Sequence, residues 1–241
     1  MRKSGKSLKL LVSIAAVAAI LAVLPGAFLS CSDKPSKTVP EKDTVSVLLF
    51  NADSAYAHIE AQCAFGPRVP NTEAHERCGQ YIVSRFKALG LAVTEQKMEL
   101  KAYNGTTLKC MNIFASTDTT AKRRILVSAH WDSRPWADND PDENNHKTPV
   151  LAANDGASGV AVMLELARAF MEDKPSVGVD FVCFDAEDYG VAQWDESNYP
   201  GDMSNSWCLG SQYFAANLPF ADYRPAYAVN LDMVGGKGAL F

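Results

Sequence analysis

The chain has 241 residues, which suffice for one domain with a substantial core and do not by themselves require two. Hydrophobic residues make up 47% of it and charged residues 21%, the composition of an ordinary globular protein. The formal net charge is −5 and no basic stripe runs along the sequence, so we expect no nucleic-acid partner.

The first thirty residues are typical of an export signal. Four basic residues lie within the first nine positions, and the run from Leu8 to Leu24 is almost entirely apolar. This run is short for a membrane anchor, because a spanning helix needs about 20 apolar residues. We therefore expect residues 1–30 to be a signal peptide.

The apolar run ends in Phe28-Leu29-Ser30-Cys31, and a polar stretch follows it. A small residue before a cysteine at this place resembles a bacterial lipoprotein signal, although Phe28 departs from the usual leucine. We expect a lipid on Cys31 and a linker at residues 31–45, which would make the protein a periplasmic or outer-membrane lipoprotein that contacts membrane only through this lipid. Plain secretion is the alternative.

Without residues 1–30 the chain has 19 basic and 28 acidic residues, a net charge of −9. We expect a monomer.

Five cysteines follow this segment, namely Cys63, Cys78, Cys110, Cys183 and Cys208. None belongs to a CxxC pair, so the sequence does not predict a zinc site made of thiolates. Export would permit a disulfide between Cys63 and Cys78, and the sequence leaves this pairing open.

Apolar periodicity and turn signals predict alternating helices and strands in residues 46–241. Helices are expected at 51–63, 72–89, 156–171 and 207–217, strands near 91–103, 108–115, 123–130, 177–184 and 226–231, and loops at 133–150 and 189–206. Successive apolar residues such as Ile125, Leu126 and Val127 indicate strands that are covered on both faces. The alternation predicts an α/β fold with a mixed, mostly parallel central sheet flanked by helices.

Acidic residues and one histidine follow the ends of the predicted strands. His130 ends one strand, Glu187 and Asp188 come directly after another, and Asp232 follows the last; Asp155 precedes a helix. Because parallel strands bring their carboxyl ends to one edge of a sheet, we expect these side chains to meet there. An imidazole among several carboxylates suits a divalent metal ion, zinc above all.

Each of these residues also has a simpler interpretation. Asp155 would then be only a helix N-cap, Glu187 and Asp188 two solvated loop acids, and Asp232 a buried hydrogen-bonding residue. We favour the metal site, because two adjacent acids repel each other unless a cation or a shared proton intervenes. In this interpretation Asp132 fixes the tautomer or the position of His130.

A resemblance to a known family is carried by five segments, HWDSRPWAD, NDGASGVAVMLELAR, FDAEDYG, WCLGSQYFA and LDMVGGKG. Together they resemble the zinc aminopeptidase-like superfamily, and more closely the bacterial glutaminyl-peptide cyclotransferases. The resemblance runs over residues 65–241 and implies a zinc exopeptidase-like catalytic domain in residues 46–241.

By this resemblance Asp155 and Asp188 are zinc ligands, although the family commonly has glutamate in place of Asp188. Glu187 is the general acid and base. Asp232 is either a second catalytic acid near the substrate or a ligand to a second zinc ion. His130 would bind that second ion only in the two-zinc peptidases.

The resemblance also implies a zinc-binding histidine in a later loop. None of His58, His75 and His146 has the matching sequence context, and no histidine follows Asp232. We therefore expect the chain to be truncated, and its fold incomplete, at the C-terminus.

The activity that the resemblance implies is cyclisation of the N-terminal glutamine of peptides or proteins to pyroglutamate, with release of ammonia and with one zinc ion. The alternative is an aminopeptidase with two zinc ions, in which His130 and Asp232 are both ligands. A third hypothesis is a surface lipoprotein without enzymatic activity, which the intact Glu187 argues against. Candidate walls of the substrate pocket are Trp131, Trp136, Trp194 and Trp207, and for Trp207 we favour core packing.

Overall fold

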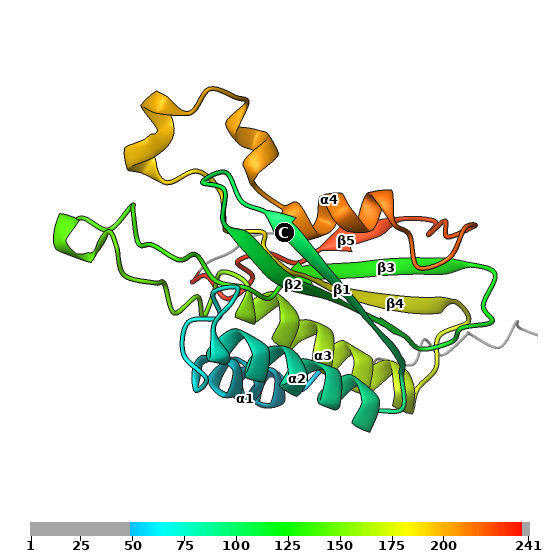
Figure 1. Cartoon of the computed structure of the whole chain (residues 1–241). Helices are drawn as coiled ribbons and strands as arrows, with labels where there is room; N and C mark the ends of the chain where they lie inside the picture. Colours follow the sequence, from blue (N-terminus) through cyan, green and yellow to red (C-terminus); the bar gives the residue numbers. More distant parts are fainter. Residues whose placement is uncertain (1–48, 238–241) are drawn as a thin grey trace, which may run out of the picture. The chain divides into compact units, whose positions relative to one another are not determined.

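The computed structural model describes residues 49–237 (Figure 1). The predicted signal peptide, the linker at 31–45 and Cys31 lie outside the described residues. Within 49–237, no helix combines the length and the apolar character that crossing a membrane requires.

The described part alternates between helices and strands, as the sequence predicts. Its α-helices are α1 (Ala52–Cys63), α2 (Glu73–Ala88), α3 (Ala157–Glu172) and α4 (Leu209–Ala216), and its strands are β1 (Ala92–Lys101), β2 (Thr107–Ser116), β3 (Arg124–His130), β4 (Gly178–Phe184) and β5 (Ala228–Asn230). Short 3-10 helices at Glu143–Asn145, Gln193–Asn198 and Met203–Ser206 lie in the two predicted long loops. Strand β5 is shorter than predicted, and α4 begins two residues after Trp207.

The strands form one sheet in the order β1-β2-β4-β3-β5. The β1–β2 and β2–β4 pairs are antiparallel, whereas β4–β3 and β3–β5 are parallel. The sheet is therefore mixed, as predicted, and its parallel part consists of the three strands that lead to the candidate site residues. Helices α1, α2 and α3 lie on one face of the sheet and α4 on the other (Figure 1).

Helix α2 shows how local sequence produces this arrangement. The Thr72 side chain accepts a hydrogen bond from the backbone N–H of His75 and caps the first turn. Gly90, with a φ of 85°, allows the chain to turn immediately after the helix. Residues Ile82 and Phe86 lie one turn apart on the buried face. Full burial of each such side chain contributes about 1.5–3 kcal/mol to the free energy of folding.

The main core fills the space between α2, α3 and the sheet. It includes Cys78, Ile82, Phe86, Trp131, Val160, Leu164 and Phe181. The five cysteines of residues 49–237 are all free, so the disulfide that the sequence left open between Cys63 and Cys78 is not formed. Cys78 lies in this core instead, where burial raises the pKa of its thiol to about 12.

Two glycines let α3 approach the carboxyl ends of the strands. At Gly159 a Cβ atom would overlap the carbonyl oxygen of Leu231 and contact the Cβ of Ala129, so only glycine permits this packing. At Gly156 a Cβ would lie 2.8 Å from His130 Cε1, and the φ of 103° is unfavourable for any other residue. The start of α3 is thereby held against the end of β3.

Candidate metal site

The candidate site lies where the three parallel strands end. His130 pairs in register with Phe184 at the end of β4, and Ser128 with Asn230 at the end of β5. The strands thus end almost level, and Glu187 and Asp232 follow within a few residues. This is the arrangement that the sequence predicts from the carboxyl ends of parallel strands.

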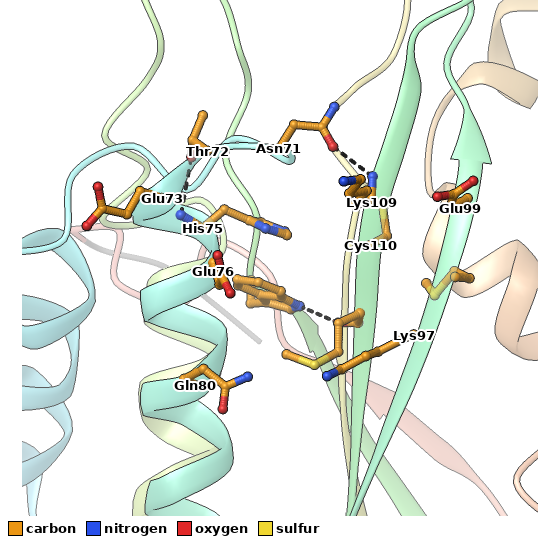
Figure 2. A pocket seen from close by; sticks show the side chains of 13 residues that line it. Asn71, Thr72, Glu73, His75, Glu76, Gln80, Lys97, Glu99, Lys109 and Cys110 are labelled. Atoms are coloured by element: carbon orange, nitrogen blue, oxygen red, sulfur yellow. Dashed lines mark hydrogen bonds between the residues drawn. The ribbon is translucent and has the colours of Figure 1, made fainter.

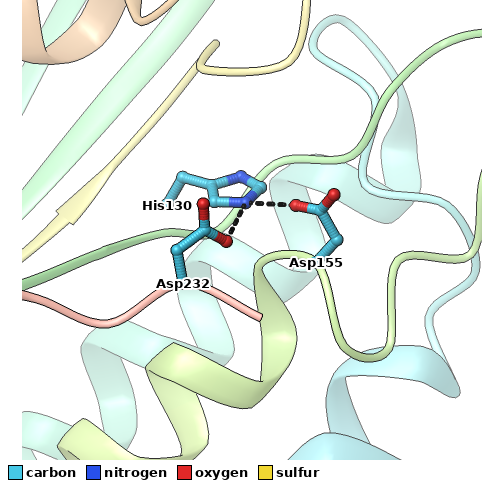
Figure 3. A group of neighbouring side chains, drawn as sticks. All are labelled: His130, Asp155 and Asp232. Carbon is cyan, nitrogen blue, oxygen red and sulfur yellow. Dashed lines mark hydrogen bonds and ion pairs between the residues drawn. The ribbon is translucent and has the colours of Figure 1, made fainter. Parts of the chain in front are cut away.

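His130 is the centre of the site. Its ring is buried, and Nε2 lies 2.8 Å from Oδ1 of Asp155 and 3.7 Å from Oδ1 of Asp232 (Figure 3). On the other side of the ring, Nδ1 lies 3.9 Å from Oε2 of Glu187. One imidazole therefore faces carboxylates from three separate segments of the chain.

The same residues fall into two sets whose ligand atoms are close enough to share a metal ion. One set is His130, Asp155 and Asp232; the other is His130, Glu187 and Asp188; in each, the ligand atoms lie within 4.8 Å of one another. Carboxylate oxygens with an imidazole nitrogen are donors that zinc accepts, so these residues fit a zinc ion. The structure brings together all five residues that the sequence singles out.

Asp155 is not a helix cap. The N-cap position of α3 is occupied by Gly156, so Asp155 lies one residue before it. The carboxylate of Asp155 instead meets His130 and lines, together with Asp188 and Trp136, a pocket of about 260 Å³. The simpler interpretation of Asp155 from the sequence is therefore wrong.

Asp132 has a role that the sequence reveals only in part. Its Oδ1 lies 3.4 Å from His130 Nδ1, as a carboxylate that orients the ring would. Its two oxygens also accept hydrogen bonds from the backbone N–H groups of Glu187, at 3.0 Å, and Asp188, at 3.1 Å. Asp132 thus fixes the turn after β4 on which both acids stand.

The electrostatics of the site follow from burial and the crowding of acids. Burial alone would lower the pKa of His130, but the carboxylates of Asp132, Asp155 and Asp232 beside its ring raise this pKa well above its usual value. Burial, reinforced by the negative charge of Asp132, raises the pKa of Asp188 to about 8. The ion pair with His130 lowers the pKa of Asp232, whose carboxylate is half exposed and so less desolvated than the sequence suggested.

Two neighbouring side chains support the loops around the site. Arg134 forms an ion pair with Asp138 and donates to the carbonyl oxygens of Asp188, at 3.0 Å, and Val191, at 3.2 Å. It thereby ties the acidic loop that follows β3 to the turn that follows β4. The thiol of Cys208 donates to Oε1 of Glu187 at 3.3 Å.

The four candidate wall tryptophans have different environments. Trp131 is fully buried in the main core and donates through Nε1 to the carbonyl oxygen of Met111, so it does not line the pocket beside Asp155 and Asp188. Trp136 does line the pocket beside Asp155 and Asp188, and Trp194 packs against it with ring centroids 5.8 Å apart. Trp207 packs against the guanidinium group of Arg134, whose Cζ lies 4.6 Å from the ring centroid.

A larger cavity lies away from these acids. It has a volume of about 720 Å³ and opens between α2 and the β1–β2 hairpin (Figure 2). Its floor is formed by buried side chains such as His75 and Trp131, and its rim by exposed charged side chains such as Glu76, Lys97 and Lys109. His75 faces Asp185 at 2.9 Å below this cavity, and it is not part of the acidic site.

The remaining histidines of the described part are also bound elsewhere. His58 Nδ1 lies 2.7 Å from the hydroxyl of Tyr81, and His146 Nε2 lies 2.8 Å from the carbonyl oxygen of Asp140. As the sequence context indicates, neither of them joins His130 at the acidic site.

The comparison with known families agrees with this geometry. Residues 112–241, which include every residue of the candidate site, match the model of peptidase family M28. The chain belongs to peptidase family M28.

Individual relatives of this M28 chain include cyclases and peptidases. The crystal structure of a Bacteroides thetaiotaomicron glutaminyl cyclase bound to N-acetylhistamine is 49% identical, with a TM-score of 0.76, over 80% of this chain and 65% of that one. A Zn-dependent exopeptidase from Parabacteroides distasonis ATCC 8503 is 47% identical, with a TM-score of 0.77, over 81% of this chain and 66% of that one. Aminopeptidase YwaD of Bacillus subtilis (strain 168) is 29% identical over 174 residues, which are 70% of this chain and 31% of that protein.

The chain therefore spans just under two thirds of the length of these two solved structures and about a third of the curated aminopeptidase. Its mixed five-stranded sheet with flanking helices is the zinc exopeptidase-like fold that the sequence predicts.

The pKa shifts predict how the stability of this M28 protein depends on pH once a chelator has removed bound metal. Folding raises the pKa of both His130 and Asp188, so between about pH 6.5 and pH 8 the folded state binds more protons than the unfolded chain. The thermal midpoint of the chelated protein should therefore fall as the pH rises through this window.

Thermal unfolding followed by circular dichroism in the chelator checks this expectation. The Asp188→Asn variant lacks one of the two titrating groups and should show a shallower decline. A midpoint that rises with pH, or an equal slope in the variant, would contradict the assignment.

Proposed function

We propose that this M28 protein is a zinc-dependent glutaminyl cyclase, which converts the N-terminal glutamine of peptides or proteins to pyroglutamate and releases ammonia. The observation that carries the proposal is the position of Glu187, a carboxylate on a fixed turn beside the candidate metal ligands. A group that can move a proton next to a metal site is what the reaction needs. The 49% identity to the B. thetaiotaomicron cyclase supports the choice of reaction.

Asp155 and Asp188 would hold the zinc ion, because both carboxylates line the same pocket. An aspartate at position 188 is one methylene shorter than glutamate and still offers a carboxylate ligand. When bound, zinc supplies a Lewis acid that polarises the side-chain amide carbonyl of the substrate. We propose one zinc ion.

The protein's own residues would move the protons. Glu187 accepts a proton from the α-amine as the amine nitrogen forms its bond to the amide carbon. Glu187 then returns this proton to the departing nitrogen, and ammonia leaves as the original C–N bond breaks. Asp232, which is half exposed beside His130, would accept a hydrogen bond from the amine and orient it.

The walls of the pocket suit a reaction in which water takes no part. Trp136 lines the pocket, and it makes edge contacts with Tyr103, Tyr189 and Trp194 at centroid distances of 5.3–5.9 Å. These rings come from three different loops around the site. An aromatic wall of this kind excludes water while it accommodates the carbon chain of a glutamine side chain.

An aminopeptidase is the second candidate, and a specific observation favours it. The ligand atoms of His130, Asp155 and Asp232 lie within 4.8 Å of one another and offer a second metal position. In that reaction Glu187 would take its proton from an attacking water molecule. The similarity to the P. distasonis exopeptidase and to aminopeptidase YwaD points the same way.

A competition between two peptides separates the candidates. The full-length protein, supplied with zinc, is incubated with one peptide that starts with glutamine and one that starts with leucine, and mass spectrometry identifies the products. We expect loss of ammonia from the glutamine peptide and no change in the leucine peptide. Release of free leucine would contradict the cyclase and support the aminopeptidase.

The Glu187→Gln variant tests the base in the same assay. Removing a general base typically costs about 10²–10⁴-fold in rate, so turnover should fall at least about 100-fold while zinc stays bound. Glu196→Gln is the matched control, because Glu196 is exposed in the neighbouring loop and should leave turnover unchanged. Full activity of Glu187→Gln would refute the role of Glu187.

We also propose that the protein is exported and anchored by a lipid on Cys31, on the strength of its N-terminal sequence. In a bacterial host grown with labelled palmitate, the wild type should incorporate the label and Cys31→Ser should not. Cys63→Ser is the control and should be labelled normally. Label that persists in Cys31→Ser would refute the anchor.

A further inference from the structure

Arg68 is a fully buried arginine in the loop between α1 and α2. Its Nε donates to the carbonyl oxygen of Trp131 at 3.0 Å, and its two terminal nitrogens donate to those of Leu151, at 2.8 Å, and Ala152, at 2.7 Å. All three acceptors are neutral. None of the ion pairs in residues 49–237 includes Arg68.

This environment differs from that of Arg124, another buried arginine of the chain. Arg124 forms an ion pair with Asp180 at 2.6 Å, on strands β3 and β4. A buried charge without a carboxylate partner costs free energy, and carbonyl hydrogen bonds alone offset this cost less well. The position of Arg68 therefore indicates a role other than stabilising the core.

The carbonyl groups that Arg68 holds belong to the two segments that carry the candidate ligands. Trp131 stands between His130 and Asp132 at the end of β3. Leu151 and Ala152 begin the turn that leads to Asp155.

The turn itself needs this support. Ala152 has a φ of 56°, a left-handed conformation that is unfavourable for alanine. Its carbonyl oxygen accepts from Arg68 and also from the backbone N–H of Ala157, at 3.3 Å. The guanidinium group and the start of α3 thus hold this carbonyl from two sides.

A second contact joins the backbone of Arg68 to the end of β3. The Arg68 N–H donates to Oγ of Ser133 at 2.5 Å, and the Ser133 N–H donates back to the carbonyl oxygen of Arg68 at 3.2 Å. The loop that carries Arg68 therefore cannot shift independently of the strand end.

We propose that Arg68 is a positioning residue for the metal site, which sets the spacing between His130 and Asp155 by binding the strand end and the turn through one planar fork of donors. The inference rests on the proposed function only in that the site binds zinc. Lysine keeps the charge but cannot bond three carbonyl groups with this fixed geometry, so the geometry of arginine is what matters.

The test compares Arg68→Lys with Arg124→Lys in the full-length protein. Zinc affinity is measured by competition with a chromophoric chelator, and kcat and KM are measured with a glutamine peptide. Changes in residues that orient metal ligands typically weaken metal binding about 10–100-fold. We expect a weakening of this size in Arg68→Lys, with the loss of activity mainly in kcat.

Arg124→Lys removes a comparable buried guanidinium group at the start of β3, at the opposite end of the strand from His130. It should therefore lower the thermal midpoint without changing zinc affinity. Circular dichroism shows whether each variant is folded. If Arg68→Lys does not fold, Ser133→Ala removes the hydroxyl that accepts from the Arg68 backbone N–H. This change loosens the loop that carries the guanidinium group more gently and should weaken zinc binding severalfold. Zinc affinity within twofold of wild type in the folded Arg68 variant, or in Ser133→Ala where that variant replaces it, would overturn the proposal. Equal weakening in Arg124→Lys would do the same.

The two proposals fail in different ways. A wild-type protein that binds zinc but does not cyclise the peptide refutes the cyclase, and the zinc affinities of the variants still test Arg68. A wild-type protein that binds no zinc overturns both.

Discussion

The crowding of negative charge around one imidazole is the constraint on which the rest of the site depends. Carboxylates from the ends of β3, β4 and β5 and from the start of α3 converge on His130. Among the described residues, His130 is the one basic side chain that forms ion pairs with Asp155, Glu187 or Asp232. An arrangement with so many acids and one imidazole favours a bound cation.

Within residues 49–237, no lysine or arginine forms an ion pair with Asp155, Glu187 or Asp232. Arg134 is paired with Asp138, and Arg124 with Asp180, so each guanidinium is committed to a carboxylate outside the site. The turn after β4 is fixed by hydrogen bonds from its backbone N–H groups to Asp132 and from Arg134 to its carbonyl oxygens. The fold thus holds the acids in place and leaves their charge to be balanced by His130 and by metal.

The sequence predicts the site residues because their positions follow from a simple rule. Apolar runs identify the buried strands, and the polar residues that end them must share one edge of the parallel part of the sheet. The capping by Thr72 and the amphipathic pattern of α2 are local signals of the same kind. They need no knowledge of the rest of the fold.

What the sequence does not predict depends on contacts between distant segments. The hydrogen bonds from Arg68 to the turn at Leu151 and Ala152 span more than 80 positions in the chain. The burial of Trp131 depends on which face of β3 is covered by α2, although this residue directly follows His130. Export would permit a disulfide between Cys63 and Cys78, yet Cys78 belongs to the apolar core.

The number and position of the zinc ions distinguish the one-zinc cyclase from the two-zinc aminopeptidase most directly. Anomalous X-ray scattering at the zinc absorption edge, from crystals of the full-length protein, would locate each ion. We predict one zinc ion between Asp155 and Asp188, with His130 still hydrogen-bonded to a carboxylate. A second ion bound to His130 and Asp232 would contradict the one-zinc cyclase and establish the two-metal site of the alternative.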